Sequence, residues 1–212
     1  LQMFGNSIPA GVGGEHGVSN RNPRSSRWKK ASQWFKANPL PCPKDFDQGK
    51  AQRQLGTLGA GNHFVEVCLN NENRIVVTVH SGSRGIGNHI ARMFIRLAQK
   101  ESKEILEDPD LAGLRGPSFE RYIAMMEWAQ LYAFTNREFM MDAAIEDLRT
   151  LIPGLKEEER INCHHNFAAL EVHFGKEVWL TRKGAIKADV ADLGIIPGSM
   201  STPTYITTGL GN

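Results

Sequence analysis

The clearest pattern of apolar and polar positions lies between Leu55 and Asn88, where two apolar runs flank a polar link. The runs, Phe64–Leu69 and Ile75–Val79, are rich in β-branched and aromatic residues, which favour strands. Asparagine dominates the link, Asn70–Asn73, and this residue tolerates the backbone of tight turns. The pattern predicts a β-hairpin.

Helical spacing replaces the alternation after the hairpin. Apolar residues recur every three or four positions from Ile86 to about Glu107, which predicts a helix with one apolar face. A longer helix is expected from Ser118 to about Leu151, with Ser118 as its N-cap. Its methionines, Met140 among them, follow the helical spacing and are expected in the core. Asn136-Arg137 interrupts this apolar stripe and is a candidate to face a site.

The flanking regions give weaker signals. Short helices are expected over 31–37 and 48–54, and residues 5–30 are expected to form a loop because Gly, Asn, Ser and Arg dominate them. Residues 194–200 are expected to form a rigid loop. Short strands are expected at Val172–Phe174, Val178–Thr181, Ala185–Ala188 and Tyr205–Thr208.

Composition narrows the class of protein. The chain has 212 residues, 41% of them hydrophobic, which suits a globular protein. A net charge of +2 excludes a globally basic nucleic-acid binder, so any such binding needs a local patch. No apolar run approaches the roughly 18 residues of a membrane span, so no membrane partner is expected. Cys42, Cys68 and Cys163 lack the spacing of a disulfide framework, which favours a reducing, cytoplasmic location.

Histidines stand at both strand ends of the predicted hairpin. His63 opens the first strand and His80 closes the second, so their imidazoles are expected to approach each other at one end of the sheet. Neutral imidazole is a common ligand of borderline divalent metals. The following Ser81–Gly85 carries Arg84 at the start of the expected helix, where backbone N–H groups and a guanidinium can receive a phosphate. The alternative, structural histidines beside an ordinary glycine turn, stays open.

The densest basic cluster lies near the N-terminus. Arg21, Arg24, Arg27 and Lys29 alternate there with Trp28, and basic residues mixed with aromatic ones suit single-stranded nucleic acid. A solvated basic loop with its tryptophan packed on the domain is the competing interpretation.

A third histidine site is the sequence Cys163-His164-His165-Asn166. Adjacent side chains of a strand face opposite ways, so one histidine would face a site and the other would pack or support it. The spacing fits no zinc template, and alternation alone does not choose between His164 and His165. The turn that contains Arg182 and Lys183 offers two cations to an anionic ligand.

Six segments together resemble the RtcB family of RNA ligases. In chain order they are GTLGAGNHFVEV, VHSGSRGIGN, NCHHNF, TRKGA, GIIPGSM and GLGN, and the resemblance covers most of residues 52–212. It implies an α+β fold, with mixed or antiparallel sheets and flanking long helices around a metal-binding cleft. It also implies a single RtcB-like catalytic domain over residues 1–212.

The resemblance further implies a reaction. RtcB-like enzymes join an RNA 3′-phosphate or 2′,3′-cyclic phosphate end to a 5′-hydroxyl end in tRNA splicing and RNA repair, using GTP and two Mn²⁺ ions. A histidine is guanylylated and passes GMP to the RNA 3′-phosphate. The implied partners are RNA ends such as tRNA halves, and the need for a helper protein stays open.

Individual residues match family positions. His63 resembles a ligand of one Mn²⁺, whereas His80 and His165 resemble ligands of the other; this resemblance is what selects His165 over His164. The positions expected to contact nucleotide, phosphate or RNA are Asn62 and Asn166 near the GTP phosphates, Arg84 and Lys183 on phosphate or RNA, and Ser199 and Met200 in the guanosine loop.

The chain also departs from the family pattern. It contains neither the Asp-x-x-Cys metal segment nor the Ser-His-Gly-Ala-Gly-Arg motif with the nucleophilic histidine, so no catalytic nucleophile is assigned here. We therefore expect a fragment that lacks N- and C-terminal parts. Two other functions remain as alternatives: a metal-dependent phosphodiesterase, and an RNA- or nucleotide-binding relative without catalysis.

Overall fold

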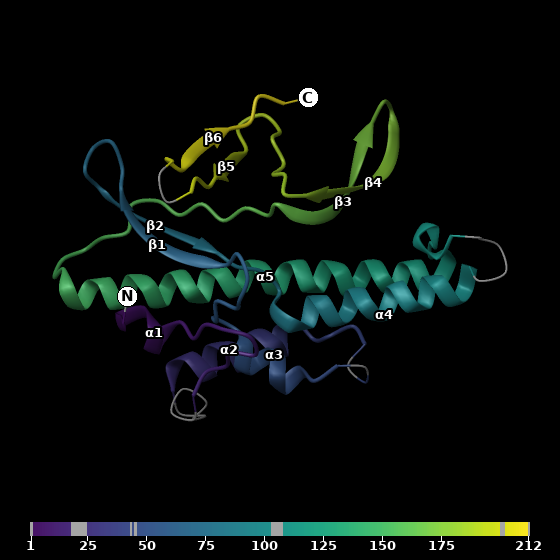
Figure 1. The fold of residues 1–212 in the computed structure, drawn as a ribbon, viewed down its shortest axis with the longest axis horizontal. Helices are drawn as coiled ribbons and strands as arrows, with labels where there is room; N and C mark the ends of the chain where they lie inside the picture. The colour runs from purple at the N-terminus through teal and green to yellow at the C-terminus, as the bar shows by residue number, and fades with distance from the viewer. Residues whose placement is uncertain are drawn as a thin grey trace. The chain divides into compact units, whose positions relative to one another are not determined.

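The computed structural model describes residues 2–17, 25–42, 44, 46–102, 108–199 and 202–211 (Figure 1). Helices and three small antiparallel sheets make up the chain, which confirms the predicted α+β class. Two compact units, residues 1–155 and 156–212, are described separately below. The single catalytic domain stays a prediction.

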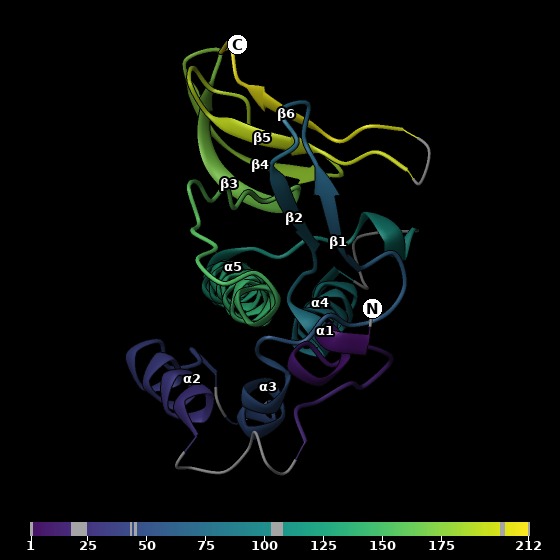
Figure 2. The same ribbon diagram turned by 90° about the vertical axis from the view of Figure 1, so that its left-hand side faces the viewer.

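Unit 1 is built around one long helix, α5 (Gly116–Leu151), whose 36 residues span about 54 Å. The other helices of this unit are α1 (Gln2–Ser7), α2 (Ser26–Ala37), α3 (Gln48–Gln54), α4 (Arg84–Ser102) and the short 3₁₀ helix η2 (Pro109–Leu111). Figures 1 and 2 show the hairpin on one side of α5 and helices α2 and α3 on the opposite side.

The predicted hairpin is confirmed. Strands β1 (Phe64–Leu69) and β2 (Ile75–His80) pair antiparallel in a register that places Val65 opposite Val79. These two valines lie on the face that packs against the C-terminal half of α5, where Met140 is fully buried. Burial of this face fixes the register, because a slip by one residue would turn the valines to solvent.

The two long helices are also confirmed, with corrected ends. Helix α4 begins at Arg84, two residues before the expected start, and α5 begins at Gly116 rather than Ser118. Ser118 is therefore not the N-cap of α5. Its hydroxyl donates to Glu101 Oε1 at 2.5 Å instead, and the fixed φ of proline in the first turn lets the helix begin without a side-chain cap.

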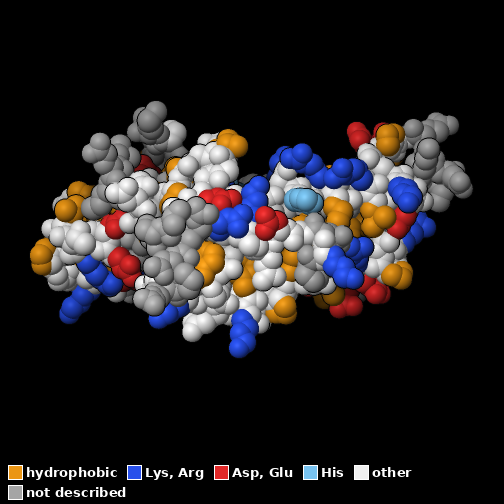
Figure 3. Space-filling model, turned by 90° about the horizontal axis from the view of Figure 1, so that it is seen from below, with side chains coloured by type: hydrophobic (Ala, Val, Ile, Leu, Met, Phe, Trp, Pro, Cys, Tyr) orange, Lys and Arg blue, Asp and Glu red, His pale blue; other side chains and the backbone are white. Residues whose placement is uncertain are grey.

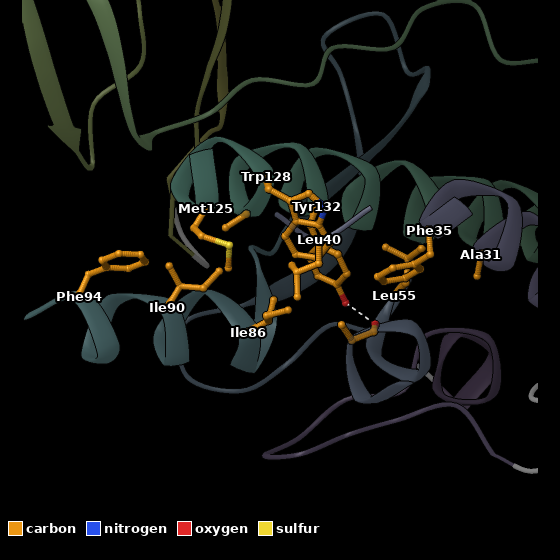
Figure 4. Close-up of a cluster of buried hydrophobic side chains, with 12 residues drawn as sticks. Ala31, Phe35, Leu40, Leu55, Ile86, Ile90, Phe94, Met125, Trp128 and Tyr132 are labelled. Atoms are coloured by element: carbon orange, nitrogen blue, oxygen red, sulfur yellow. Dashed lines mark hydrogen bonds between the residues drawn. The ribbon is translucent and has the colours of Figure 1, made fainter. Parts of the chain in front are cut away.

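Aromatic side chains fill the core on the N-terminal half of α5 (Figure 4). Tyr132 stacks on Trp128 with centroids 5.5 Å apart, and Trp34 meets both rings edge-on. Met125 is completely buried in the same cluster, and Ile86, Ile90 and Phe94 of α4 complete it. Of the methionines predicted in the apolar stripe of α5, Met140 is completely buried, whereas Met126 is only partly buried and its neighbour Met125 occupies the core.

The described residues near the N-terminus contain more helix than the sequence suggests. Residues 5–30 were expected to form a loop, but α1 occupies Gln2–Ser7 and α2 begins at Ser26 instead of residue 31. Ser25 explains the early start of α2, because its hydroxyl accepts from Trp28 N at 3.2 Å as an N-cap. The expected helix over 48–54 is confirmed as α3.

Unit 2 consists of two hairpins. Strands β3 (Asn166–His173) and β4 (Lys176–Lys183) form one, and β5 (Leu193–Ile196) and β6 (Tyr205–Thr208) form the other. The strand predicted at 185–188 is wrong, and β5 lies in a segment expected to be a loop. Short apolar runs do not identify their partner strand, so cross-strand pairing decides which run becomes a strand.

His16, 1% exposed, makes the stability of unit 1 depend on pH. Its Nε2 donates to Gly56 O at 3.2 Å, and burial, aided by the Arg27 charge, lowers its pKa to about 4. The unfolded chain binds this proton near pH 6.5, so folding stability is retained above that pH and lost as the pH falls toward 4. The loss from this group is expected to be on the order of 2–3 kcal/mol.

Urea unfolding at pH 7.5 and pH 4.5 measures this effect. The pH dependence should be shallower in His16→Gln, which keeps a donor but cannot titrate, whereas His89→Gln on the exposed side of α4 should retain the dependence of the parent protein. Identical pH profiles for the parent and His16→Gln would contradict the assignment.

Candidate functional site

The two histidines of the hairpin meet at its open end. His80 ends β2 opposite Phe64, and His63 directly precedes β1, so antiparallel pairing brings both imidazoles to one edge. Their ring centroids lie 5.7 Å apart, and the Phe64 ring meets His80 edge-on at 5.4 Å. The expected approach of His63 and His80 is therefore present in the structure.

His63 is held in one tautomer by a backbone carbonyl. Its Nδ1 lies 3.0 Å from Leu58 O, and a carbonyl only accepts, so Nδ1 carries the proton and Nε2 retains its lone pair. Burial lowers the pKa of His63, the Arg84 charge adds to this, and the bond to Leu58 opposes it. Metal-binding histidines are neutral and typically donate their second N–H to a carbonyl or carboxylate.

Arg84 lies against the same turn, at the first residue of α4. Its Nε donates to Thr57 Oγ1 at 2.8 Å and one Nη donates to Gly14 O at 3.4 Å. Gly59 lies directly beneath, because a Cβ there would be 2.0 Å from Arg84 Nη1. The half-buried guanidinium is held by protein acceptors on two sides, which orients it for an anionic ligand.

Unit 2 supplies the other predicted histidine. His165 and His164 lie just before β3 rather than within it, so strand alternation does not apply to them. Asn166 Nδ2 lies 3.0 Å from His165 Nε2, and Asn166 Oδ1 accepts from Gly184 N at 2.8 Å. His164 packs its ring on Phe167 at 5.9 Å.

Lys183 pairs with Asn166 across the hairpin, so these two predicted phosphate contacts share one register position with His165 beside them. Ser199 follows β5, where its backbone N–H donates to Thr202 Oγ1 at 2.7 Å. Asn62 is exposed in the loop before His63. Met200 lies outside the described residues.

The predicted basic cluster divides between surface and interior. Lys29 is exposed on α2, but both Nη atoms of Arg27 are buried, with no hydrogen-bond partner among the described residues. Burial lowers the pKa of Arg27 to about 10. Arg21 and Arg24 lie outside the described part of the chain.

The surroundings of Arg27 carry both signs of charge. It lines a cavity of about 760 Å³ in unit 1 together with acidic residues of α5, Asp142, Glu146 and Asp147. A cavity of mixed charge is a poor match for a polyanion alone. Figure 3 instead shows Lys and Arg side chains on the surface where α4 lies, and Arg92, Arg96 and Lys100 are exposed there.

Sequence reasoning missed the groups that hold this site in place. Thr57 anchors Arg84, Leu58 anchors His63, and Gly59 leaves room for both side chains, although only their glycine-rich setting distinguishes these residues in the sequence. Asn136 of α5 was expected to point into a site, and it is completely buried against the turns that precede β1 and follow β2. Within the described ranges, no group of three or more His, Cys, Asp or Glu side chains is placed to hold a metal.

The fold and these contacts define an α+β protein with paired imidazoles beside an inward-facing arginine, which suits a metal ion next to a phosphate. The chain belongs to the tRNA-splicing ligase RtcB family, whose model matches residues 14–212. It is 46% identical over 171 residues to the RNA-splicing ligase RtcB of Escherichia coli K12, which covers 76% of this chain and 42% of the relative.

Archaeal relatives are more distant. The tRNA-splicing ligase RtcB of Pyrobaculum aerophilum is 30% identical over 204 residues, covering 76% of this chain and 42% of the relative. That of Thermococcus kodakarensis is 31% identical over 196 residues, covering 74% and 41%. The chain thus spans about 42% of the length of the first relatives that it matches. Across the described residues, no helix has the length and apolar character to span a membrane.

Proposed function

We propose that this chain forms part of a GTP- and Mn²⁺-dependent RNA ligase that joins RNA 3′-phosphate or 2′,3′-cyclic phosphate ends to 5′-hydroxyl ends. Membership of the RtcB family over residues 14–212 carries the proposal. The relatives named above are RNA- or tRNA-splicing ligases, and the family match spans both His63 and His80. The physiological partners would be broken or spliced RNAs, with a helper protein as an untested addition.

The residues of unit 1 suit a metal-supported phosphate site. His63 would donate the Nε2 lone pair to one Mn²⁺, and His80 would bind a second ion. His165, in unit 2, remains a proposed metal ligand. Bound Mn²⁺ would supply charge stabilisation for phosphoryl transfer. Arg84 would hold phosphate oxygens, because its guanidinium is oriented by Thr57 and Gly14 before any ligand arrives.

The residues of unit 2 suit the nucleotide. Asn166 bonds both His165 and Gly184 N, so it would fix the imidazole and the Lys183–Gly184 turn in one arrangement. Lys183 would then place its ammonium on a phosphate. Asn62, Ser199 and Met200 remain proposed nucleotide contacts, and Arg21, Arg24, Arg27 and Lys29 remain proposed RNA contacts, with Lys29 the exposed side chain among those described.

The guanylylated histidine of the proposed reaction has no counterpart among the motifs of this chain, so the test uses the full-length protein. Incubation with α-labelled GTP and Mn²⁺ should leave acid-labile label on the protein, and a chelator should prevent it. The amount of label on His63→Ala should be at least tenfold lower than on the parent protein, since the substitution removes a proposed metal ligand. His89→Ala, an exposed histidine of α4, is the matched control and should retain it.

Other outcomes identify other functions. Opening of a 2′,3′-cyclic phosphate with Mn²⁺ but without GTP or label would contradict ligation and support a metal-dependent phosphodiesterase. RNA binding that weakens steeply with salt, without label or turnover, would indicate a silent RNA-binding relative. We also propose a reducing, cytoplasmic location, because Cys42, Cys68 and Cys163 are all free thiols.

A further inference from the structure

The buried side-chain amide of Asn136 lies between the loop before β1 and the loop after β2. Asn136 is at the middle of α5, between the aromatic cluster at one end and the Met140 cluster at the other, and it is 0% exposed. Burying an amide costs free energy unless its oxygen and its nitrogen are both hydrogen-bonded. The partners of Asn136 therefore indicate why a polar residue stands in this apolar stripe.

The amide of Asn136 joins two loops that are far apart in sequence. Its Oδ1 accepts from Gly56 N at 2.7 Å and from Thr57 N at 3.2 Å, both in the loop before β1. Its Nδ2 lies within 3.1 Å of Thr57 O and of Ser81 Oγ, and within 3.2 Å of Gly82 O. Two backbone donors at Oδ1 fix which end of the amide is oxygen.

A continuous chain of hydrogen bonds leads from this amide to His63. Ser81 Oγ has one proton, which it donates to Leu58 O at 2.7 Å, so the hydroxyl is an acceptor toward Asn136 Nδ2. Leu58 O accepts a second bond, from His63 Nδ1 at 3.0 Å. Leu58 O thus determines the His63 tautomer, which leaves the lone pair on Nε2, and the Asn136–Ser81 contacts hold this carbonyl in place.

The geometry points to Asn136 as a positioning residue: through Ser81 it holds the Leu58 carbonyl in place, and this carbonyl sets the tautomer and the direction of the His63 imidazole that would receive the metal. This inference rests on the proposed function only for the identity of the ion, because the hydrogen-bond chain is present without it. Groups behind a metal-bound histidine commonly change metal affinity by about 10- to 100-fold when they are removed.

Two substitutions interrupt the chain at different points. Asn136→Asp keeps the shape and the acceptor for Gly56 N, but it has no N–H for Ser81 or for the carbonyls. Ser81→Ala removes one hydroxyl and leaves α5 intact, so it remains informative if the first variant fails to fold. Thr135→Val is the matched control, because Thr135 is also buried in α5 and its hydroxyl bonds only Leu131 O among the hydrogen bonds described.

The experiment uses the full-length protein and two readouts. Calorimetric titration with Mn²⁺ should show affinity at least tenfold weaker in Asn136→Asp and in Ser81→Ala, and unchanged affinity in Thr135→Val. Long-range ¹H–¹⁵N spectra without metal should assign the Nδ1–H tautomer to His63 in the parent protein and in Thr135→Val. Asn136→Asp and Ser81→Ala should show an added population of the Nε2–H tautomer.

The two readouts separate the two proposals. If the parent protein binds no Mn²⁺ but the two variants still show the added Nε2–H population, the proposed metal chemistry is overturned and the positioning role is supported. The inference fails if Asn136→Asp and Ser81→Ala have native circular dichroism and keep the His63 tautomer of the parent protein, together with its Mn²⁺ affinity if the parent binds Mn²⁺. Asn136 would then be only a structural cross-link.

Discussion

Gly59→Ala is expected to destabilise unit 1 by roughly 2–4 kcal/mol and to weaken metal binding, although it adds only one methyl group. The added Cβ would lie 2.0 Å from Arg84 Nη1 and 2.7 Å from His63 Nδ1. Gly59 also has φ +96°, a conformation that alanine adopts only with strain. The guanidinium and the imidazole would both have to move.

The movement would break the contacts that build the site. Arg84 would leave Thr57 Oγ1, and His63 would leave Leu58 O, so the ligand direction of its Nε2 would be lost. The main chain of Gly59 is also held in place, since its carbonyl accepts a hydrogen bond from Gly11 N at 2.8 Å. The turn therefore has little freedom to relax around a methyl group.

Gly61→Ala provides a matched control within the same loop. Gly61 has φ +82°, but a Cβ there would meet nothing within 4 Å, so only the backbone strain of about 1–2 kcal/mol is expected. Urea unfolding and Mn²⁺ titration of both variants in the full-length protein measure the difference. Equal losses of stability and of metal affinity at positions 59 and 61 would show that the close approach of Arg84 has no consequence.

The candidate site shows what sequence reasoning can and cannot predict. Alternation predicted the hairpin, and antiparallel pairing then required His63 and His80 to meet, because strand-end residues on opposite strands are neighbours. The contact that orients His63 comes from Leu58 O, and Ser81 links this carbonyl to Asn136, 78 positions further along the chain. No local pattern predicts that a helix amide and a histidine share a link through one carbonyl.

The errors have a similar origin. Strand β5 and helix α1 were missed because short elements depend on partners rather than on their own periodicity: β5 pairs with β6, and α1 packs on α5. The start of α5 was displaced by two residues because proline near a helix start competes with serine as the first signal. Long periodic elements were predicted well because their signal is summed over many residues.

Tyr132 is the residue on which the packing of α5 against α2, α3 and α4 depends most. It is 0% exposed, stacks on Trp128, and lies 5.9 Å from the Trp34 ring. Its hydroxyl donates to Ala51 O at 2.7 Å, the bond drawn as a dashed line in Figure 4. Because α3 ends at Gln54, this carbonyl is among the last four of the helix, which lack a partner in an α-helical ladder.

Tyr132→Ala is expected to lower the free energy of unfolding by about 4 kcal/mol, because it removes a buried ring, its stacking and its hydrogen bond together. Tyr132→Phe keeps the ring and loses only the donor to Ala51, so a smaller loss of about 1 kcal/mol is expected. The difference between the two variants therefore measures the packing contribution of the ring.

Chemical unfolding of the full-length protein, followed by tryptophan fluorescence, measures both losses, since Trp34 and Trp128 surround the substituted ring. Leu131→Ala, at the preceding position of α5 and 43% exposed, is the control and should cost less than about 1 kcal/mol. If Tyr132→Ala were no more destabilising than Leu131→Ala, the aromatic cluster would not hold α5 against its neighbours. The Asn136 contacts and the Met140 cluster would then be what keeps α5 beside the hairpin.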